Sequence, residues 1–142
     1  MTKRMTDAEI DAFLQQPLHA ILATQASDGP PQLSPVWFLY EDGRLCTSIL
    51  SGSAKHENLK RRPGVSFCID GGRSDVRTVM LYGTAELHPG DDKASEAMRR
   101  RIIRHYHESE EDARSYYESV RDRPHTLLVL EPERVVSQDF SD

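Results

Sequence analysis

Short β-type runs separated by turn residues fill most of this chain, and this alternation constrains its fold more than any other feature. The clearest turn is Asp42-Gly43, because Asp-Gly between two such runs is the strongest short-range signal of a β-hairpin. A second hairpin turn is predicted at 27–31, where small, acidic and proline residues break the pattern. The last run can resume at 134–137. Six strands are therefore predicted, at 18–24, 32–40, 45–50, 65–70, 77–88 and 125–130.

Two residues inside these runs carry positional information. Pro35 has no backbone N–H, so the run 32–40 is predicted to be an edge strand, to contain a bulge, or to mark the split of a barrel. Gly83 lies in the middle of the long fifth run, which predicts a bulge or a close approach by backbone or ligand.

Helices are predicted between and around the strands. Thr6 and Glu9 have the spacing of a capping box, and Pro17 ends the helix that they begin. A second helix is predicted over 51–62. A third has an apolar face with three arginines (Arg99, Arg100 and Arg104) lying off it, and its apolar residues are Ala94, Ala97, Met98, Ile102 and Tyr106. A fourth ends at Pro124 and carries Ala113, Tyr116, Tyr117 and Val120.

The order of these elements favours an antiparallel barrel. No βαβ alternation is present, which excludes a Rossmann fold, and the chain has no Gly-rich dinucleotide fingerprint or Walker motif. At 142 residues the chain has the length of one domain, so residues 1–142 are expected to form a single domain. The predicted class is α+β, mainly β, with short flanking helices.

Composition and charge narrow the functional classes. The longest apolar stretches are far shorter than the ~20 residues of a membrane helix, and the N-terminus lacks the apolar segment of a signal peptide, so a cytoplasmic protein is expected. Its two cysteines are expected to be reduced thiols. The histidines and cysteines show no metal-ligand spacing, so no metal is expected. A net charge of −5 argues against a nucleic-acid-binding barrel, for which the only support is the short basic patch 60–62.

The segment 51–63 has the clearest chemical signal. It places hydroxyls and Lys55 at the start of a helix, where unpaired N–H groups and the helix dipole favour an anion such as phosphate. An equally simple interpretation makes Ser53 an N-cap and the basic residues a solvated face. Trp37 is likewise either a core residue or a stacking surface for a flat ring, and Tyr116 and Tyr117 favour a core or dimer contact.

A series of short motifs, taken in order, resembles the pyridoxamine 5′-phosphate oxidase-like split-barrel family over nearly the whole chain. It is most similar to the branch of flavin and deazaflavin oxidoreductases in which Ser-Pro-Val-Trp-Phe recurs. The motifs are Leu22-Ala-Thr, Asp28-Gly-Pro-Pro-Gln-Leu-Ser-Pro-Val-Trp-Phe, Asp42-Gly, Thr47, Ser53-Ala-Lys, Asn58-Leu-Lys-Arg-Arg-Pro and Tyr82-Gly-Thr-Ala-Glu-Leu.

The resemblance implies a six-stranded Greek-key split barrel that forms a homodimer, with two cofactor sites between the subunits. Ser53 and Lys55 match the family's phosphate-binding residues, and Thr47 matches a hydroxyl beside them. Asn58 and Arg61 match more weakly. The strand that runs along the flavin ring is matched by Ser34, Pro35, Val36 and Trp37.

The same resemblance implies an oxidoreductase that transfers a hydride between bound deazaflavin (coenzyme F420) or FMN and a small organic substrate. No catalytic residue is indicated, because the cofactor carries the hard chemistry. Ala54 stands where true pyridoxamine phosphate oxidases have arginine, and 135–142 lacks their substrate signature, which argues against vitamin B6 oxidation. The alternatives are an FMN-dependent enzyme of the pyridoxamine-phosphate-oxidase type and a non-enzymatic flavin- or ligand-binding protein on the same barrel.

Overall fold

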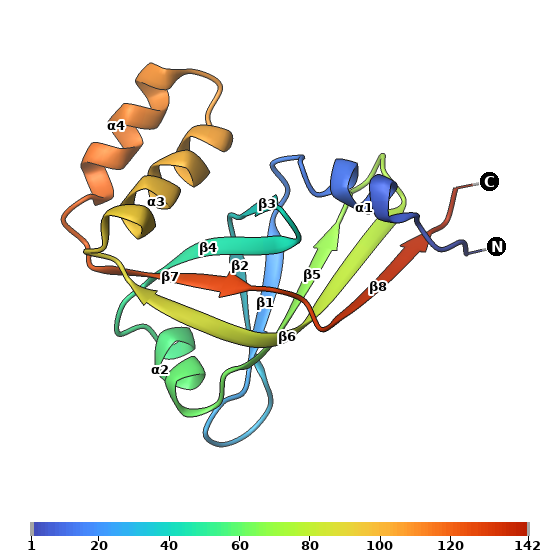
Figure 1. The fold of residues 1–142 in the computed structure, drawn as a ribbon, viewed down its shortest axis with the longest axis horizontal. Coiled ribbons are helices and arrows are strands. Elements are labelled where there is room, and N and C mark those ends of the chain that lie inside the picture. The colour runs from blue at the N-terminus through green and yellow to red at the C-terminus, as the bar shows by residue number, and fades with distance from the viewer. Residues whose placement is uncertain (1, 142) are drawn as a thin grey trace.

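The computed structural model describes residues 2–141, which form a mostly β structure with a helical pair on one side (Figure 1). The helices in this range are α1 (Asp7–Phe13), α2 (Ala54–Arg61), α3 (Lys93–His105) and α4 (Glu110–Val120). The strands are β1 (Ala20–Thr24), β2 (Gln32–Val36), β3 (Leu39–Glu41), β4 (Arg44–Leu50), β5 (Gly64–Asp70), β6 (Arg77–Pro89), β7 (His125–Leu130) and β8 (Arg134–Asp139).

The strands form one curled antiparallel sheet in the order β2-β1-β5-β6-β7-β4-β3, and β8 pairs with β6. The two end strands, β2 and β3, are joined by only Trp37 and Phe38, so the sheet must curl until its ends lie close together. Strands β5, β6 and β7 follow one another, and β4 returns to lie beside β7, which is Greek-key order. This curled sheet is consistent with the split barrel that the resemblance implies.

The prediction of six strands is wrong, because the described residues contain eight. The run 32–40 is broken between β2 and β3. At the break, side chains form hydrogen bonds with the backbone groups that a continuous strand ladder would pair. The Phe38 N–H donates to the Tyr106 hydroxyl at 3.0 Å, and the Thr47 hydroxyl donates to the Trp37 carbonyl at 2.6 Å. The resumption at 134–137 is a separate strand, β8, which pairs with β6 rather than extending β7.

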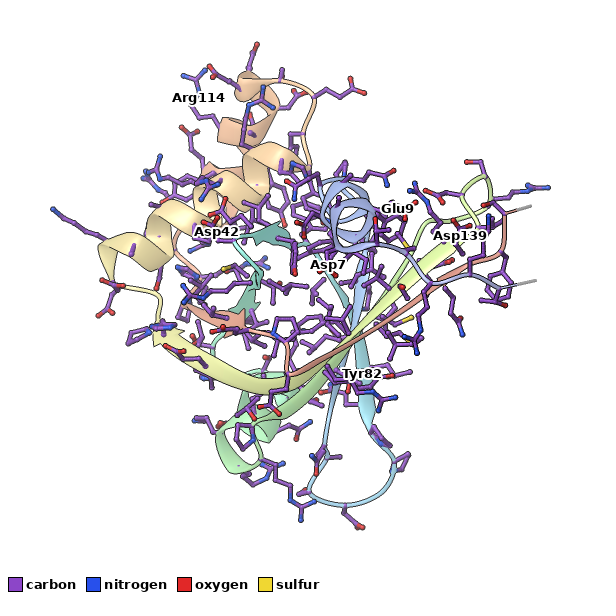
Figure 2. The ribbon with its side chains drawn as sticks, turned by 45° about the vertical axis from the view of Figure 1, so that its right-hand side comes forward. Asp7, Glu9, Asp42, Tyr82, Arg114 and Asp139 are labelled. Atoms are coloured by element: carbon purple, nitrogen blue, oxygen red, sulfur yellow. The ribbon has the colours of Figure 1, made fainter. Side chains whose placement is uncertain are left out.

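The two hairpins and the edge position of Pro35 are confirmed. β1 pairs with β2, and β3 pairs with β4 through a turn in which Asp42 has φ 52° and Gly43 has φ 73° (Figure 2). Positive φ at both central residues is the requirement of a type I′ turn, which Asp-Gly meets. Pro35 lies on β2 at one end of the sheet, where a strand has only one ladder neighbour and proline is tolerated.

Gly83 confirms the predicted close approach. Strand β6 pairs with β8 over its first half and with β7 over its last five residues, and Gly83 lies between the two pairings. A Cβ at this position would be 2.8 Å from the Leu130 side chain and 3.3 Å from the Glu133 backbone nitrogen. Glycine therefore lets the β7–β8 connection cross directly over β6.

The barrel interior holds the core, to which α1 contributes Ile10 and Phe13, its C-cap contributes Leu14, and α2 contributes Leu59. Alternation along β5 buries Val65, Phe67 and Ile69, as a half-buried strand requires. The α1 capping box is present, with Thr6 and Glu9 each bonded to the other's backbone N–H. No helix of residues 2–141 is long and apolar enough to cross a membrane.

The predicted apolar face of the third helix is correct at Ile102, which is buried, and wrong at the first turns of the helix. Ala94 and Ala97 are exposed and Met98 is only partly buried, whereas α3 buries Ser95, Arg99, Ile102 and Ile103. The face is rotated because Arg99 packs inward and finds backbone carbonyls for its guanidinium. As a result, α3 and α4 pack outside the barrel, with α3 against β4 and β7 (Figure 1).

Candidate functional site

A cleft of about 370 Å³ lies between the helical pair α3–α4 and the adjoining strands of the barrel. Its walls come from the end of β2 and the link to β3, from the end of β4, from α2, and from both helices of the pair. The lining residues are His19, Pro35, Val36, Trp37, Ser48, Ile49, Leu50, Lys55, Arg99, Ile102, Ile103, Tyr116, Val120, Arg123, Pro124 and His125.

Trp37 lies in the wall of this cleft rather than in the barrel core. It is partly buried and stacks on Tyr106, with ring centroids 4.9 Å apart and planes 9° apart. Tyr116 approaches it at 5.2 Å in a tilted arrangement, so the C-cap of α3 and the helix α4 each contribute to one aromatic cluster. Burial raises the pKa of Tyr106 to about 12, so its hydroxyl keeps its proton and donates to the Leu18 carbonyl. Tyr106 thereby holds both Trp37 and the strand break in place.

Lys55 reaches the cleft from the first turn of α2. Its ammonium donates to the Ser34 hydroxyl at 3.0 Å, and within residues 2–141 it has no carboxylate within salt-bridge distance. In the same part of the chain, the backbone N–H groups of Ala54 and Lys55 have no acceptor, as expected for the first turn of a helix. The cleft therefore contains a positive charge that the protein itself leaves without a negative partner.

Ser53 and Thr47 have structural partners and do not line the cleft. Ser53 is the N-cap of α2, where its hydroxyl accepts from the His56 N–H. Thr47 is fully buried, and its hydroxyl donates to the Trp37 carbonyl. The N-cap interpretation of Ser53 is thus correct as local structure, and the predicted contacts of both hydroxyls with phosphate stay predictions.

Asn58 and Arg61 lie away from the cleft, in a network that ties α2 to β1 and β2. The buried Asn58 amide donates to the Thr24 hydroxyl at 3.1 Å and to the Gln32 side-chain oxygen at 3.2 Å. Its own oxygen accepts from the Arg61 guanidinium at 2.7 Å. Of the predicted site residues, the structure therefore brings Ser34, Pro35, Val36, Trp37 and Lys55 together, and it places Thr47, Ser53, Asn58 and Arg61 outside the cleft lining.

Sequence reasoning missed Arg99. Its side chain is 6% exposed, and its guanidinium donates to the carbonyl groups of Val120 and Arg123, which fastens the end of α4 to α3. The spacing of Ser95, Arg99, Ile102 and Ile103 is a helical face, so the position carried a weak signal. Arg99 is also paired with Glu96 at 3.7 Å, so the positive charge of the cleft comes mainly from Lys55 and Arg123, and the lining contains no Asp or Glu.

His125 is the second missed residue, and it lies buried at the edge of the cleft. Its Nδ1 lies 2.9 Å from the Ser48 hydroxyl, and its Nε2 lies 3.0 Å from the Glu96 carboxylate and 3.1 Å from the Gly90 carbonyl. Burial and the Arg99 charge lower the pKa of His125, against the opposing effect of Glu96. No local signal could have identified this group, because Ser48 and His125 are 77 residues apart in the sequence.

Glu96 is the charged member of this group. Burial alone would raise its pKa, but hydrogen bonds from Tyr117 and His125 and the nearby Arg99 hold the pKa below its ordinary value. Glu96 is therefore ionised at neutral pH. The resulting cluster combines a carboxylate, a neutral imidazole and a hydroxyl, and only the last two line the cleft.

Comparison with known proteins gives both family and fold matches. The family model for pyridoxamine 5′-phosphate oxidase matches residues 6–139. A conserved hypothetical protein from Mycobacterium tuberculosis is 24% identical with a TM-score of 0.78, covering 95% of this chain and 85% of its own. An F420 reductase is 20% identical with a TM-score of 0.67, covering 88% of this chain and 94% of its own.

A third solved structure has the same fold. It is a pyridoxamine 5′-phosphate oxidase-related, FMN-binding protein from Nostoc punctiforme, 18% identical with a TM-score of 0.67, covering 94% of this chain and 84% of its own. At these identities the structural likeness establishes the fold, and the family model spans nearly all of the chain. The chain therefore belongs to the pyridoxamine 5′-phosphate oxidase family.

Proposed function

We propose that this protein is an oxidoreductase that holds a phosphate-bearing deazaflavin (coenzyme F420), or in second place FMN, in the cleft beside Lys55. The observation that carries the proposal is the Lys55 ammonium, which faces the cleft with a hydroxyl partner and no carboxylate among the described residues. An ammonium without a negative partner at a helix N-terminus is suited to a phosphate.

The residues present fit such a cofactor. Lys55, the Ser34 hydroxyl and the free N–H groups of Ala54 and Lys55 would hold the phosphate. Pro35, Val36 and Trp37 supply an apolar wall for a flat ring. When bound, the ring supplies hydride transfer, and the protein's task is to bind and orient the ring and its substrate.

The names of the neighbours support a cofactor of this class, because one is an F420 reductase and another is an FMN-binding protein. We favour the deazaflavin because its glutamate tail needs cations beyond the phosphate. Within residues 2–141, Arg61 and Arg62 form no ion pair, whereas Lys60 pairs with Glu57 at 2.6 Å. Arg61 and Arg62 are also exposed. Arg61 uses one guanidinium nitrogen on Asn58, so its remaining donors and all those of Arg62 would meet a tail that leaves the cleft along α2.

Titration of the protein with F420 and with FMN, followed by fluorescence, tests the proposal. Lys55→Ala should weaken binding of the preferred cofactor about ten- to a hundred-fold, because a charge-assisted hydrogen bond contributes roughly 1.5 to 3 kcal/mol. Lys60→Ala is the matched control, since Lys60 lies on the same helix but pairs with Glu57. Equal affinities of wild type and Lys55→Ala would refute the site.

The same preparation separates the remaining alternatives. A protein that purifies yellow with tightly bound FMN reverses the preferred order of cofactors. Steady-state turnover with the reduced cofactor distinguishes an enzyme from a carrier, because a non-enzymatic binding protein would hold the cofactor without consuming it.

We also propose that the protein is a homodimer with its cofactor sites at the subunit interface. The apolar run 36–40 does not support this, because Val36, Phe38 and Tyr40 are buried in the chain's own core. Support comes instead from an apolar row across the outer face of the sheet, formed through strand pairing by Pro35, Ile21, Cys68, Met80 and Val136.

This apolar row is flanked by further exposed apolar surface. Within the row Ile21 is 37% exposed, and beside it Leu33 is 67% exposed. The strand register places Tyr82 of β6, labelled in Figure 2, on the same face as Met80. Light scattering at micromolar concentration should give about twice the chain mass of 16.1 kDa, and Leu33→Glu should shift that mass toward the monomer. A wild-type mass of one chain would contradict the proposed dimer.

A further inference from the structure

Three side chains from separate elements form a continuous hydrogen-bonded chain that ends in the cleft. Ser48 of β4 bonds to His125 of β7 at 2.9 Å, and His125 bonds to Glu96 of α3 at 3.0 Å. β4 and β7 are paired in the register Leu50 opposite His125, which sets Ser48 diagonally across from His125 on the face that α3 covers. Pairing of the two strands therefore fixes the hydroxyl against the imidazole.

The partners of His125 determine which of its nitrogens carries the proton. Nε2 faces two acceptors, the Glu96 carboxylate and the Gly90 carbonyl, so Nε2 is the protonated nitrogen. Nδ1 is then a free base, and it accepts the hydrogen bond of the Ser48 hydroxyl. The lowered pKa of His125 agrees with a neutral ring at pH 7.

Gly90 is part of this arrangement. A Cβ at position 90 would collide with the backbone carbonyl of His125, so the turn after β6 can lie against His125 only with glycine there. The Gly90 carbonyl thus joins Glu96 in holding the ring, and the imidazole has no freedom to exchange its two nitrogens.

We infer that Ser48 is the proton-transfer residue of the cleft, with His125 as the base behind it and Glu96 as a positioning residue, and that the substrate is an alcohol or its carbonyl product. This inference rests on the proposed oxidoreductase function. Ser48 and His125 both line the cleft, whereas Glu96 does not, so the chain of hydrogen bonds runs from the partly exposed Glu96, through the buried His125, to the place where a substrate would lie.

The proton and hydride balance in this scheme. In alcohol oxidation, the C–H bond of the carbinol carbon breaks, and the oxidised flavin or deazaflavin that the cleft would hold would take up its electron pair as hydride. The hydroxyl proton moves to the Ser48 oxygen while the proton of Ser48 moves to His125 Nδ1, and the C=O bond forms. The imidazolium then releases its proton to solvent, and carbonyl reduction follows the reverse path.

The charges of the cleft exclude an amine as the preferred substrate. Lys55 and Arg123 line the cleft and form no ion pair among the described residues, whereas Arg99 is paired with Glu96 at 3.7 Å. The two unpaired cations would repel an ammonium group. A neutral or anionic alcohol meets no such repulsion. The matched probes are 2-propanol, lactate and isopropylamine, which share one reacting carbon skeleton and differ in charge.

Imidazole NMR of the protein without cofactor tests the hydrogen-bonded chain independently of turnover. We expect His125 to be the Nε2–H tautomer at pH 7, with an Nδ1 resonance that moves in Ser48→Ala. Ser51→Ala is the matched control, because Ser51 is another partly buried serine that bonds to a β7 side chain, Thr126, outside the cleft. An Nδ1–H tautomer, or an Nδ1 resonance unmoved by Ser48→Ala, overturns the relay.

Kinetics with the bound cofactor then test whether the reaction uses this hydrogen-bonded chain. Ser48→Ala should lower kcat for 2-propanol or lactate about 10²- to 10⁴-fold, with cofactor affinity unchanged, and Ser51→Ala should not. If the wild type does not bind either cofactor, the proposed function is refuted, while the NMR test of the hydrogen-bonded chain remains valid. In a protein that binds cofactor, no turnover of either alcohol, or equal turnover of isopropylamine, overturns the substrate class.

The pH profile tests Glu96 as a positioning residue. The groups facing His125 are Ser48, Glu96, Arg99 and the Gly90 carbonyl, with Tyr117 acting through Glu96. Alcohol oxidation requires neutral His125, so kcat/KM should rise with pH through the His125 pKa, which lies below 6.5. Glu96→Gln removes a charge that favours the imidazolium and should move this rise to lower pH; an unmoved profile assigns Glu96 a purely structural role and refutes that part of the inference.

Discussion

Lys55 and Asn58 lie less than one turn apart on the same short helix, yet their side chains differ in how fully the protein supplies them with hydrogen-bond partners. The Asn58 amide has protein partners on both its nitrogen and its oxygen. The Lys55 ammonium has one hydroxyl partner and no carboxylate among the described residues. A polar group that the protein satisfies holds the fold together, whereas one that it leaves available is suited to a ligand.

This difference sorts the residues that the family resemblance singled out. Three of them form hydrogen bonds within the protein. Asn58 bonds to side chains of β1 and β2, Thr47 bonds to the Trp37 carbonyl, and Ser53 caps the N-terminus of α2. Lys55 and Ser34 bond to each other at the cleft. Resemblance alone could not separate the two groups, because a residue that supports a site recurs in a family as readily as one that contacts the ligand.

The largest effect that would test this comparison is on stability. Asn58→Ala removes two hydrogen bonds, to the buried Thr24 hydroxyl and to the Gln32 side chain, and leaves these two groups only their mutual hydrogen bond of 3.3 Å. The loss should lower the free energy of unfolding by about 2 to 3 kcal/mol. Lys55→Ala should change it by less than about 0.5 kcal/mol, because Lys55 is a partly exposed side chain with a single hydrogen bond. Chemical denaturation measures both, and equal losses would break the distinction.

A smaller effect is expected beyond the cleft, on cofactor affinity. Arg61→Glu with Arg62→Glu should weaken deazaflavin binding by about three- to ten-fold at low salt, and less at high salt, because exposed charges are screened over about 8 to 10 Å at physiological ionic strength. FMN ends at its phosphate, so its affinity should change little. If the reversal leaves deazaflavin affinity untouched, these arginines are a solvated face and the preference for the deazaflavin loses its support.

The smallest effect concerns His125, another group with partners inside the protein. Its pKa is lowered below 6.5 in the folded state, so the unfolded chain binds the proton more readily. The stability contributed by the neutral ring is therefore present above pH 6.5 and is lost as pH falls through the lowered pKa. Chemical denaturation between pH 5 and 8 should show that the free energy of unfolding falls less steeply with decreasing pH in His125→Gln than in wild type. His19→Gln, at an exposed position, should keep the wild-type slope.

Much of the fold follows from local physical chemistry, and those parts were predictable. The β3–β4 turn needs two residues at positive φ, and Asp42-Gly43 provides them without reference to the rest of the molecule. The capping box of α1 is complete within four residues, from Thr6 to Glu9. Pro35 restricts β2 to an edge for a reason internal to proline.

The predictions that were wrong concern local structure that depends on residues far away in the sequence. The strand break at Trp37 and Phe38 depends on Tyr106 and Thr47, which lie elsewhere in the chain. The buried face of α3 includes Arg99 because carbonyl groups at the end of α4 satisfy its guanidinium. Apolar periodicity cannot register such an arginine, because the pattern treats every charged residue as solvent-facing.

By itself, the sequence determined an antiparallel β fold with short helices, its hairpin turns, and a basic helix start capable of receiving an anion, because turns, caps and strand periodicity are settled by neighbours in the chain. Only the tertiary structure decided which polar groups remain available. Ser34 reaches Lys55 across 21 residues and Ser48 reaches His125 across 77, and such pairings depend on how the sheet curls and where α3 packs. Which partner a polar group has depends on its position in space, and the local sequence pattern does not contain that position.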